Sequence, residues 1–293
     1  MTIHDPEALG QRPLRVIVVA YHAVDALRAC LAPLAGRLDV VVVDNSSDPD
    51  VRSAAELFGA RYIDPGSNRG FGAGVNVALR EVLAGPPVDL LLLNPDAVTT
   101  AADVGRMATA LARSPADIAA LSPALRTSNG AAQRVMWPFP SPARAWLEAL
   151  GGGSLLRRQD FAVGTALLLR WEAVREVGLF DERFFLYAEE TDWQRRAALL
   201  GWRSTMIPEI VADHIGGGTS SDPKRREALC HAGTETYVRK WFGARGWASY
   251  RVAVIFGAVL RQALLRRQRR DRASLRRQIY VRGPRRFAGL DDT

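Results

Sequence analysis

Cysteine is scarce in this sequence of 293 residues, which contains only Cys30 and Cys230. The two residues lie far apart and outside any metal-ligand spacing, so neither a disulfide framework nor a cysteine-based metal site is expected. A chain of this length can instead bury a sizeable core, and its 48% hydrophobic and 24% charged residues are an ordinary globular composition. The scarcity of cysteine fits a reducing cytosol.

Long apolar runs are also missing. The longest, VAVIFGAVL at 252–260, has about half of the length that a transmembrane helix needs. The first apolar run, VIVVA, is too short for the hydrophobic region of a secretory signal, and Asp5 and Glu7 precede it. We therefore expect a cytoplasmic protein that is soluble or bound to a membrane surface.

The positive charge of the chain is concentrated near its C-terminus. The formal net charge is +8, and residues 261–286 contribute +10 through eleven Arg and one Asp. Residues 287–293 contribute −2, so the other 260 residues sum to zero. The basic character therefore belongs to a C-terminal segment rather than to the body of the protein.

Short apolar runs alternate with helical patterns along the first part of the chain. The runs predict strands at 14–21, 39–45, 60–65 and 88–96, and the segments near 24–35, 49–58, 72–84 and 101–112 predict helices. This alternation predicts an α/β fold, with a mostly parallel central sheet, flanking helices and right-handed crossovers. The strands lack polar alternation, which is typical of a sheet covered on both faces.

The regular pattern ends after about residue 122. Residues 123–160 are rich in Pro and Gly and predict a long excursion or a mobile loop. Beyond them we expect strands at 161–170 and 202–210, and helices at 171–177, 189–200, 223–243 and 246–281.

Polar residues follow the predicted parallel strands. They are Tyr21, Asp44 with Asn45, residues 64–69 and residues 94–96. Ligands of open α/β sheets bind beyond the carboxyl ends of the strands, so a binding site is predicted at this edge.

Four features there allow both a functional and a structural interpretation. The glycines of NRGFGAGVN (68–76) could bring backbone close to a diphosphate, or could permit tight helix–sheet packing. Asp44 could bind a base or ribose, or form an Asx turn. Asp96 could hold a divalent cation, or cap the helix that begins near Thr100. His214 precedes three glycines, which could form a loop that moves over a ligand, although a lone His is usually structural.

Together these segments resemble the inverting GT-A glycosyltransferases of family 2, particularly the bacterial rhamnosyltransferase-like branch. The matching segments, in the family's order and spacing, are VVAYH, VVVDNSS, NRGFGAGVN, LLLLNPDAV, VGTALLLR, VGLFDERFFLYAEETDWQRR, GW and HIGGG. They cover roughly residues 14–220. The resemblance implies a GT-A fold and the metal-dependent transfer of a sugar from a nucleotide-diphospho-sugar to an acceptor hydroxyl, with inversion.

The resemblance also implies site residues. Asp44 would read the nucleotide base, and the donor would be bound by Tyr21, Asp44, Asn45, Asn68, Arg69, Gly70, Gly72, Asn76, Asn94, Gly164 and Thr165. Asn94 replaces the first acid of the family's D-x-D motif, which leaves Asp96, together with His214, to hold Mg²⁺ or Mn²⁺.

The stretch FFLYAEETDW (184–193) contains the acids that match the family's catalytic E-D motif. Glu189 corresponds to its Glu, and Glu190 corresponds to its Asp, the general base, although Glu is one methylene longer. Asp192 is an alternative base, but it shares a helix face with Glu189 and has Arg196 four positions on as an ion-pair partner. The structural alternative for all three acids is a solvated helix start that matches the helix dipole.

We expect a GT-A domain at 1–243, with a nucleotide-binding half at about 14–122 and an acceptor half at about 123–220, followed by a helical tail at 244–293. Val254, Ala258, Arg261, Leu265 and the Arg-rich turns after them predict an interfacial helix on an anionic membrane. Nucleic-acid binding and a solvated tail are the alternatives. Polyprenyl-diphosphate-linked acceptors, which the family often uses, favour the inner face of the plasma membrane and no nucleic-acid partner.

The function expected is transfer of L-rhamnose from dTDP-rhamnose to a lipid-linked or cell-surface glycan precursor, with a UDP-sugar as the alternative donor. The alternative functions are a nucleotidyltransferase that acts on a sugar phosphate and a nucleic-acid-binding protein that uses the Arg-rich tail.

Overall fold

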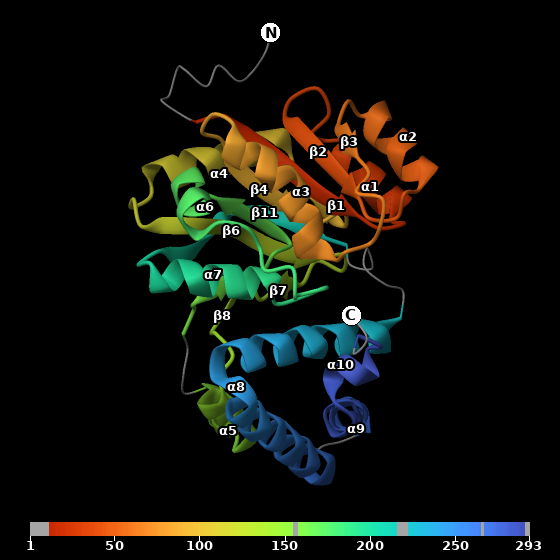
Figure 1. Cartoon of the computed structure of the whole chain (residues 1–293), viewed down its shortest axis with the longest axis vertical. Coiled ribbons are helices and arrows are strands. Elements are labelled where there is room, and N and C mark those ends of the chain that lie inside the picture. The colour runs from red at the N-terminus through yellow and green to blue at the C-terminus, as the bar shows by residue number, and fades with distance from the viewer. Residues whose placement is uncertain (1–11, 155–157, 216–221, 265–266, 291–293) are drawn as a thin grey trace. The chain divides into compact units, whose positions relative to one another are not determined.

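The computed structural model describes residues 12–154, 158–215, 222–264 and 267–290 (Figure 1). The chain forms two compact units. The first contains residues 1–137, 159–185 and 189–221, and the second contains residues 138–158, 186–188 and 222–293.

A nine-stranded sheet forms the centre of the described part of the first unit, in the order β3-β2-β1-β4-β10-β6-β11-β5, with β7 beside β6. Its strands are β1 (Leu14–Ala20), β2 (Asp39–Asp44), β3 (Arg61–Ile63), β4 (Asp89–Leu93), β5 (Ala97–Val98), β6 (Ile118–Thr127), β7 (Ala132–Gln133), β10 (Ala166–Leu169) and β11 (Arg203–His214). β1 to β4 pair in parallel, β10 is antiparallel to both β4 and β6, and β6 is parallel to β11. The predicted α/β fold is confirmed, with a parallel half and a mixed half.

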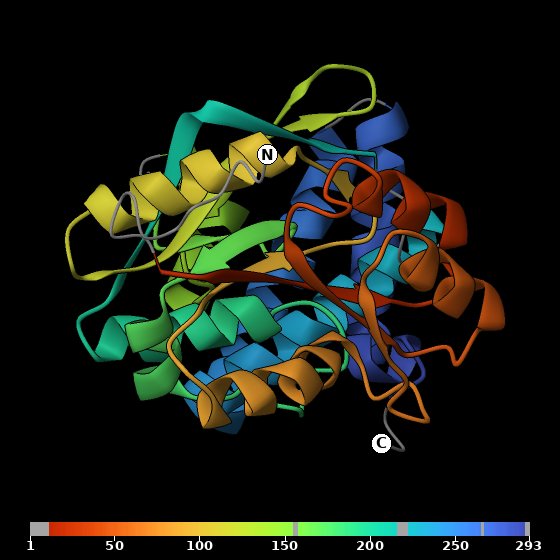
Figure 2. The same ribbon diagram turned by 90° about the horizontal axis from the view of Figure 1, so that it is seen from above.

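Helices cover both faces of this sheet, as the uniformly apolar strands predict. They are α1 (Val24–Leu31), α2 (Pro49–Leu57), α3 (Phe71–Ala84), α4 (Ala101–Arg113), α6 (Trp171–Val177) and α7 (Glu189–Leu199). Figure 2 shows α4 on one side of the strands and α3, α6 and α7 on the other. The Val and Leu side chains of β1, β2, β4 and β10 that lie between these layers are almost entirely buried.

Residues 123–160 were predicted to be a long excursion or a mobile loop; residues 138–158 do leave the first unit for the second, but the prediction of a loop is wrong, because the segment contains strands and a helix. Residues 123–127 continue β6, residues 142–149 form α5 (Pro142–Ala149), and β8 (Met136–Trp137) pairs with β9 (Phe161–Ala162). Pro123 hid the strand, because proline cannot donate to a sheet ladder. In the structure it lies opposite Ile207, where the β6–β11 register shifts. The expected strand at 161–170 is likewise divided, since residues 163–165 separate β9 from β10.

The described part of the second unit is helical. It contains α5, the short 3₁₀ turn η2 (Gly152–Ser154), α8 (Pro223–Leu264), α9 (Arg267–Arg282) and α10 (Pro284–Phe287), and α8 packs against α5, α9 and α10. Gly243, with φ +66° and ψ −171°, divides α8 into two helices. Among the described helices, none combines the length and the apolar character that crossing a bilayer requires.

Candidate active site

The carboxyl ends of the parallel strands meet at one edge of the sheet, as predicted. Tyr21, Asp44, Asp64 and Asn94 directly follow or complete β1, β2, β3 and β4, whose pairings are all parallel. Tyr21 is exposed there, while the Asp44 side chain is buried. The structure therefore brings the predicted nucleotide-binding residues of these strand ends to one edge.

Asp44 uses its carboxylate to shape the loop after β2. Its Oδ1 accepts hydrogen bonds from the backbone N–H and the hydroxyl of Ser46. Its Oδ2 accepts from the N–H of Asp48 at 2.8 Å and from the Tyr62 hydroxyl at 2.9 Å. Burial and the neighbouring Asp44 carboxylate raise the pKa of Tyr62 to about 12, so the phenol keeps its proton. The Asx-turn interpretation is therefore confirmed, and contact with a base stays a prediction.

The glycine run begins at Gly70, where another backbone segment lies too close to leave room for a side chain. Gly70 has φ +93°, and an added Cβ would overlap the carbonyl group of Phe185. That carbonyl accepts from the N–H of Phe71 at 2.9 Å. Asn45 donates to the Gly70 carbonyl at 3.0 Å, and the Asn68 side chain accepts from the Gly70 N–H at 3.0 Å. Asn45 and Asn68 thus hold the turn that starts α3.

Gly72 and Gly74 continue the same close packing. A Cβ on Gly72 would lie 3.3 Å from Cβ of Phe180 and 3.4 Å from Cβ of Glu189, and one on Gly74 would lie 2.8 Å from the Val19 side chain. These approaches confirm the interpretation of the glycines as a packing device. Their contact with a diphosphate remains a prediction.

Asn76 fastens α3 to the segment that precedes α7. Its side chain accepts from the Phe180 N–H and donates to the Phe180 carbonyl, both at 2.9 Å, and also donates to Glu182 at 3.0 Å. Glu182 pairs with Arg69 and Arg80, each at 2.7 Å. In this structure Asn76 and Arg69 therefore make structural contacts, and their expected part in donor binding remains a prediction.

Asp96 and His214 come together from distant parts of the chain. The antiparallel pairing of β5 with β11 sets His214 opposite Ala97, and His214 Nε2 lies 3.5 Å from Asp96 Oδ2. His214 Nδ1 lies 2.8 Å from Oε1 of Gln133, which can only accept, so Nδ1 donates this hydrogen bond and Nε2 is the ring nitrogen that faces Asp96. A histidine fixed in this way is typical of metal ligands.

A divalent cation fits this pair, because a carboxylate oxygen and an imidazole lone pair at this separation are both electron donors. Within the described ranges, no group of three or more His, Cys, Asp or Glu side chains is placed to hold a metal. Further ligands would therefore come from outside this pair. The three glycines after His214, expected to form a moving loop, lie outside the described residues.

The loop at 163–165 connects the Asp96 region to the acids of α7. The Asn94 N–H donates to the Thr165 carbonyl at 2.9 Å, where β4 and β10 begin their antiparallel pairing. A Cβ on Gly164 would lie 3.4 Å from Cγ of Glu190. Asn94, Thr165, Gly164 and Glu190 therefore form a continuous path from the predicted cation site to the predicted base.

The three acids of α7 have three different environments. Glu189 is buried and its Oε2 has no hydrogen-bond partner, and burial followed by the charge of Glu190 raises its pKa well above the usual range. Glu190 is half-buried beside Gly164. Asp192 is fully buried and pairs with Arg196 at 3.1 Å, as predicted. The alternative of a solvated helix start is wrong for Glu189 and Asp192.

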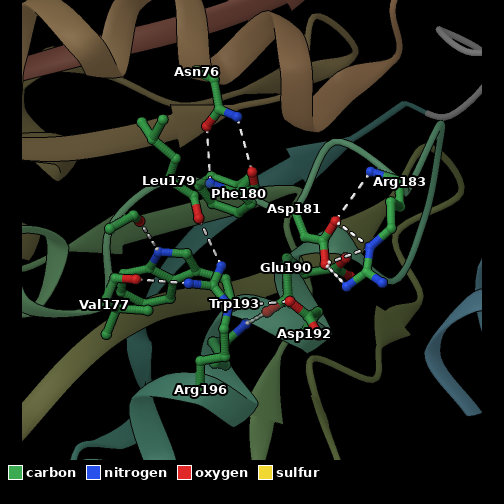
Figure 3. Close-up of polar contacts among 12 residues, drawn as sticks. Asn76, Val177, Leu179, Phe180, Asp181, Arg183, Glu190, Asp192, Trp193 and Arg196 are labelled. Atoms are coloured by element: carbon green, nitrogen blue, oxygen red, sulfur yellow. Dashed lines mark hydrogen bonds and ion pairs between the residues drawn. The ribbon is translucent and has the colours of Figure 1, made fainter. Parts of the chain in front are cut away.

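One supporting residue, Gln194, was not identified from the sequence, and Arg196 has contacts beyond its predicted pairing with Asp192. Arg196 donates to the carbonyls of Val177 and Leu179, each at 2.7 Å, and so ties α7 to the end of α6 (Figure 3). Gln194 accepts from the N–H of Ala162 at 2.8 Å and donates to its carbonyl at 2.7 Å, as a neighbouring strand would. Gln194 therefore fixes β9, and with it the 163–165 loop, beside Glu190.

The backbone just before α7 adopts an unusual conformation. Tyr187 and Ala188 have φ +67° and +70°, although neither is glycine. Left-handed backbone costs about 1–2 kcal/mol per non-glycine residue. The residues that lead directly into Glu189 are thus held in a strained conformation.

Comparison with protein families gives one match that covers more than half of the chain. The family model described as glycosyl transferase family 2 matches residues 15–178. This range ends before Glu189 but includes the strand ends and the 163–165 loop.

Two curated proteins are similar in sequence. The N-acetylglucosaminyl-diphospho-decaprenol L-rhamnosyltransferase of Mycobacterium tuberculosis is 27% identical, over 89% of this chain and 97% of its own length. The low-salt glycan biosynthesis hexosyltransferase Agl10 of Haloferax volcanii is 26% identical, over 63% of this chain and 61% of its own length.

Two solved structures show the same fold at low sequence identity. Glucosyl-3-phosphoglycerate synthase from M. tuberculosis, solved with Mn²⁺, UDP and glucosyl-3-phosphoglycerate, gives a TM-score of 0.52 at 18% identity, over 80% of this chain and 81% of its own. TarS 1-349 from S. aureus gives 0.52 at 14% identity, over 92% of each chain. These similarities support the GT-A fold.

Proposed function

The chain belongs to glycosyl transferase family 2 and to its rhamnosyltransferase-like branch, and on that premise we propose that it transfers L-rhamnose from dTDP-rhamnose to a hydroxyl group of a lipid-linked glycan precursor. The sugar and the acceptor class are those named for the M. tuberculosis relative, which this chain matches over nearly its whole length. The nucleotide rests on the family resemblance alone, and a UDP-sugar is the alternative.

One observation carries this proposal. The predicted base and the predicted cation site belong to one connected set of contacts, which runs from Asp96 and Asn94 through Thr165 and Gly164 to Glu190. An inverting transferase needs both parts, because the acceptor must lose a proton while the nucleoside diphosphate leaves.

Glu190 acts as the general base in this proposal. Its carboxylate takes the proton of the acceptor hydroxyl while that oxygen bonds to the anomeric carbon and the carbon–diphosphate oxygen bond breaks. Glu189 holds its own proton, because burial raises its pKa, so the two adjacent carboxyls do not both carry charge. Asp192 and Arg196 keep the helix in place beneath them.

Asp96 and His214 would hold the divalent cation, Mg²⁺ or Mn²⁺. When bound there, the cation supplies positive charge that stabilises the departing diphosphate. Gln133 contributes by keeping His214 in the tautomer that offers Nε2 as a ligand.

In this proposal three segments of the chain have different roles. Residues 14–122 would bind the nucleotide, residues 123–220 would present the acceptor and the base, and the basic segment from 244 onward would hold the enzyme at the inner face of the plasma membrane. A nucleotidyltransferase and a nucleic-acid-binding protein were the alternatives, and the family match favours neither.

A sugar-transfer assay with dTDP-rhamnose, Mn²⁺ and a water-soluble acceptor tests the proposal. We expect Glu190→Gln to lower kcat by about 10²- to 10⁴-fold, since it removes the base without changing the size of the side chain. Running the same assay with UDP- and GDP-sugars, and with EDTA, identifies the nucleotide and the cation requirement.

Glu209→Gln provides the matched control, because Glu209 is an exposed carboxylate on β11. It should retain the wild-type rate. Wild-type turnover in Glu190→Gln would rule out Glu190 as the base. If dTDP-rhamnose, the UDP-sugars and the GDP-sugars all fail to donate, nucleotide-diphospho-sugars are ruled out as the donor class.

A further inference from the structure

The two units carry opposite net charges. The second unit contains 21 Lys and Arg against 7 Asp and Glu, a net charge of +14, and the first contains 18 against 24, a net charge of −6. The basic character is therefore a property of the whole second unit, not only of residues 261–286. An acidic first unit offers no general attraction to polyanions, so any such attraction belongs to the second.

An apolar stripe lies on the outer surface of α8, after its break at Gly243. It consists of Ala248, Val252, Ile255, Phe256, Val259 and Ala263. The spacing i, i+4, i+7, i+8, i+11, i+15 places them on one helical face about 22 Å long. Val252, Phe256 and Val259 are 54%, 40% and 44% exposed. Such a row of exposed apolar side chains normally marks an interaction surface.

The other faces of this helix are used for packing inside the second unit. Ala258 is buried, and a Cβ on Gly257 would lie 2.9 Å from the Ala149 backbone of α5. Arg251 donates to the carbonyls of Tyr280 and Val281, each at 2.7 Å. Among the residues expected to form the interfacial helix, Ala258 thus faces inward, and Arg261 donates to the Glu148 carbonyl. Leu265 lies outside the described residues.

A hollow of about 440 Å³ adjoins the N-terminal end of the stripe. Its lining residues are Arg239, Trp247, Ala248, Arg251, Val252, Ile255 and Val281, so it shares three members with the stripe. Apolar side chains next to guanidinium groups match the boundary of a bilayer, where acyl chains lie just below phosphates.

We infer that the stripe on α8 is the surface by which the second unit lies in the interface of an anionic phospholipid bilayer, with the hollow accepting part of a lipid chain. The inference rests on the proposed function, whose acceptor is lipid-linked. A second copy of the chain is a poorer occupant. If the stripes of two copies packed against each other, two second units, each with a net charge of +14, would come together and repel. Nucleic acid would use the charge but would gain nothing from exposed Val and Phe.

Co-sedimentation of the full chain with vesicles tests this inference. We expect binding to vesicles of phosphatidylcholine mixed with phosphatidylglycerol, and little binding to phosphatidylcholine alone. The double variant Val252→Glu with Val259→Glu should bind the mixed vesicles at least about tenfold more weakly, a loss of about 1.4 kcal/mol. Phe256 is left unchanged, because its ring lies 5.9 Å from that of Trp146.

The control double variant is Leu57→Glu with Val211→Glu, two side chains of the first unit that are 71% and 44% exposed. It adds the same charge to the protein and should bind as the wild type does. Thermal melting shows that both variants are folded, and both should transfer sugar to a water-soluble acceptor at the wild-type rate. Sedimentation needs no turnover, so a failure of the proposed function is seen separately.

Two results would overturn the inference. The first is absence of wild-type binding to the mixed vesicles, and the second is equal binding by the stripe variant. If a stripe variant that binds equally also loses self-association in light scattering, or binding to RNA, the surface is assigned to a second copy or to nucleic acid instead.

Discussion

Adjacent side chains in α7 differ more in environment than their shared chemistry suggests. Glu189 packs against Gly72 of α3 and is shielded from water, whereas Glu190 turns toward Gly164. Successive positions on a helix point about 100° apart, so one step along the chain moves the side chain from a buried position at Glu189 to a half-buried one at Glu190. Burial and the charge of Glu190 raise the pKa of Glu189, and a carboxyl in such an environment typically has a different role from a neighbouring acid that is more accessible.

Replacing Glu189 with Gln should change how stability depends on pH. Below the unfolded-state pKa of about 4.3, both states of the wild type carry the proton. Above it, the unfolded carboxyl ionises while the buried one keeps its proton, because its pKa is raised. The free energy of unfolding of the wild type should therefore fall as pH rises, by up to about 1.4 kcal/mol per pH unit, and Glu189→Gln should lack this loss.

The measurement is Tm across about pH 5 to 8, a range above that unfolded-state pKa. The difference in Tm between Glu189→Gln and the wild type should increase steadily in favour of the variant. Glu209→Gln, an exposed carboxylate, should run parallel to the wild type. Parallel curves for Glu189→Gln as well would show that the buried carboxyl has no raised pKa.

At the level of the elements, local patterns predicted β1 to β4, β10 and most of β11, but they missed β6, which long-range pairing builds into the sheet. Each strand from β1 to β4 is a short apolar run followed by a turn and an amphipathic helix, and such signals are complete within a short window. β6 and β11 contain Pro123 and Pro208, which weaken the local signal, and they pair across a register shift. Only their mutual pairing identifies them as neighbours.

In the candidate active site, too, some features could be predicted from the sequence and others depend on contacts between distant residues. The polar strand ends, the Asp192–Arg196 pair and the meeting of Asp96 with His214 followed from strand order, helix spacing or the family resemblance. Gln194 bonds a strand 32 positions away in the chain. No local pattern contains such a contact, so its role could be seen only in the folded molecule.

The close contact between the backbone at Gly70, where α3 starts, and the Phe185 carbonyl can be tested directly. Gly70→Ala should lower the free energy of unfolding by about 3 kcal/mol or more, because it combines a left-handed backbone with overlap against the Phe185 carbonyl. Gly66 also has a positive φ, +77°, but has open space around it, so Gly66→Ala should cost only about 1–2 kcal/mol. Urea unfolding measures both, and equal losses would contradict the overlap.

At the scale of the whole molecule, the basic C-terminal segment is part of a folded unit. Ile279 and Tyr280 of α9 are fully buried, and the Tyr280 ring lies 5.8 Å from that of Trp247. Buried Glu235 of α8 accepts from the N–H of Arg285 at 3.1 Å. Charge and core thus alternate along this segment, which explains why its sequence resembles a solvated tail.

Substitutions at two adjacent positions can distinguish a folded C-terminal segment from a solvated tail. Tyr280→Ala should destabilise the protein by about 3–5 kcal/mol, since it empties a fully buried aromatic site. Val281→Ala, at an exposed position next to it, should cost less than about 0.5 kcal/mol. Thermal or urea unfolding of the full chain reads both values, and a small loss for Tyr280→Ala would show that the segment is an appendage after all.

The left-handed residues Tyr187 and Ala188 place this enzyme under two opposing selective demands. Glycine in place of Ala188 would relieve left-handed strain of about 1–2 kcal/mol, which exceeds the loss of about 0.4–1 kcal/mol that the greater freedom of glycine in the unfolded chain causes, so the folded chain would be more stable to heat. It would also loosen the peptide that sets the first turn of α7, where the two glutamates must keep their separate orientations. A lineage that adapts to higher temperature therefore has an accessible stabilising substitution here, and the expected cost of adopting it is catalytic rather than structural.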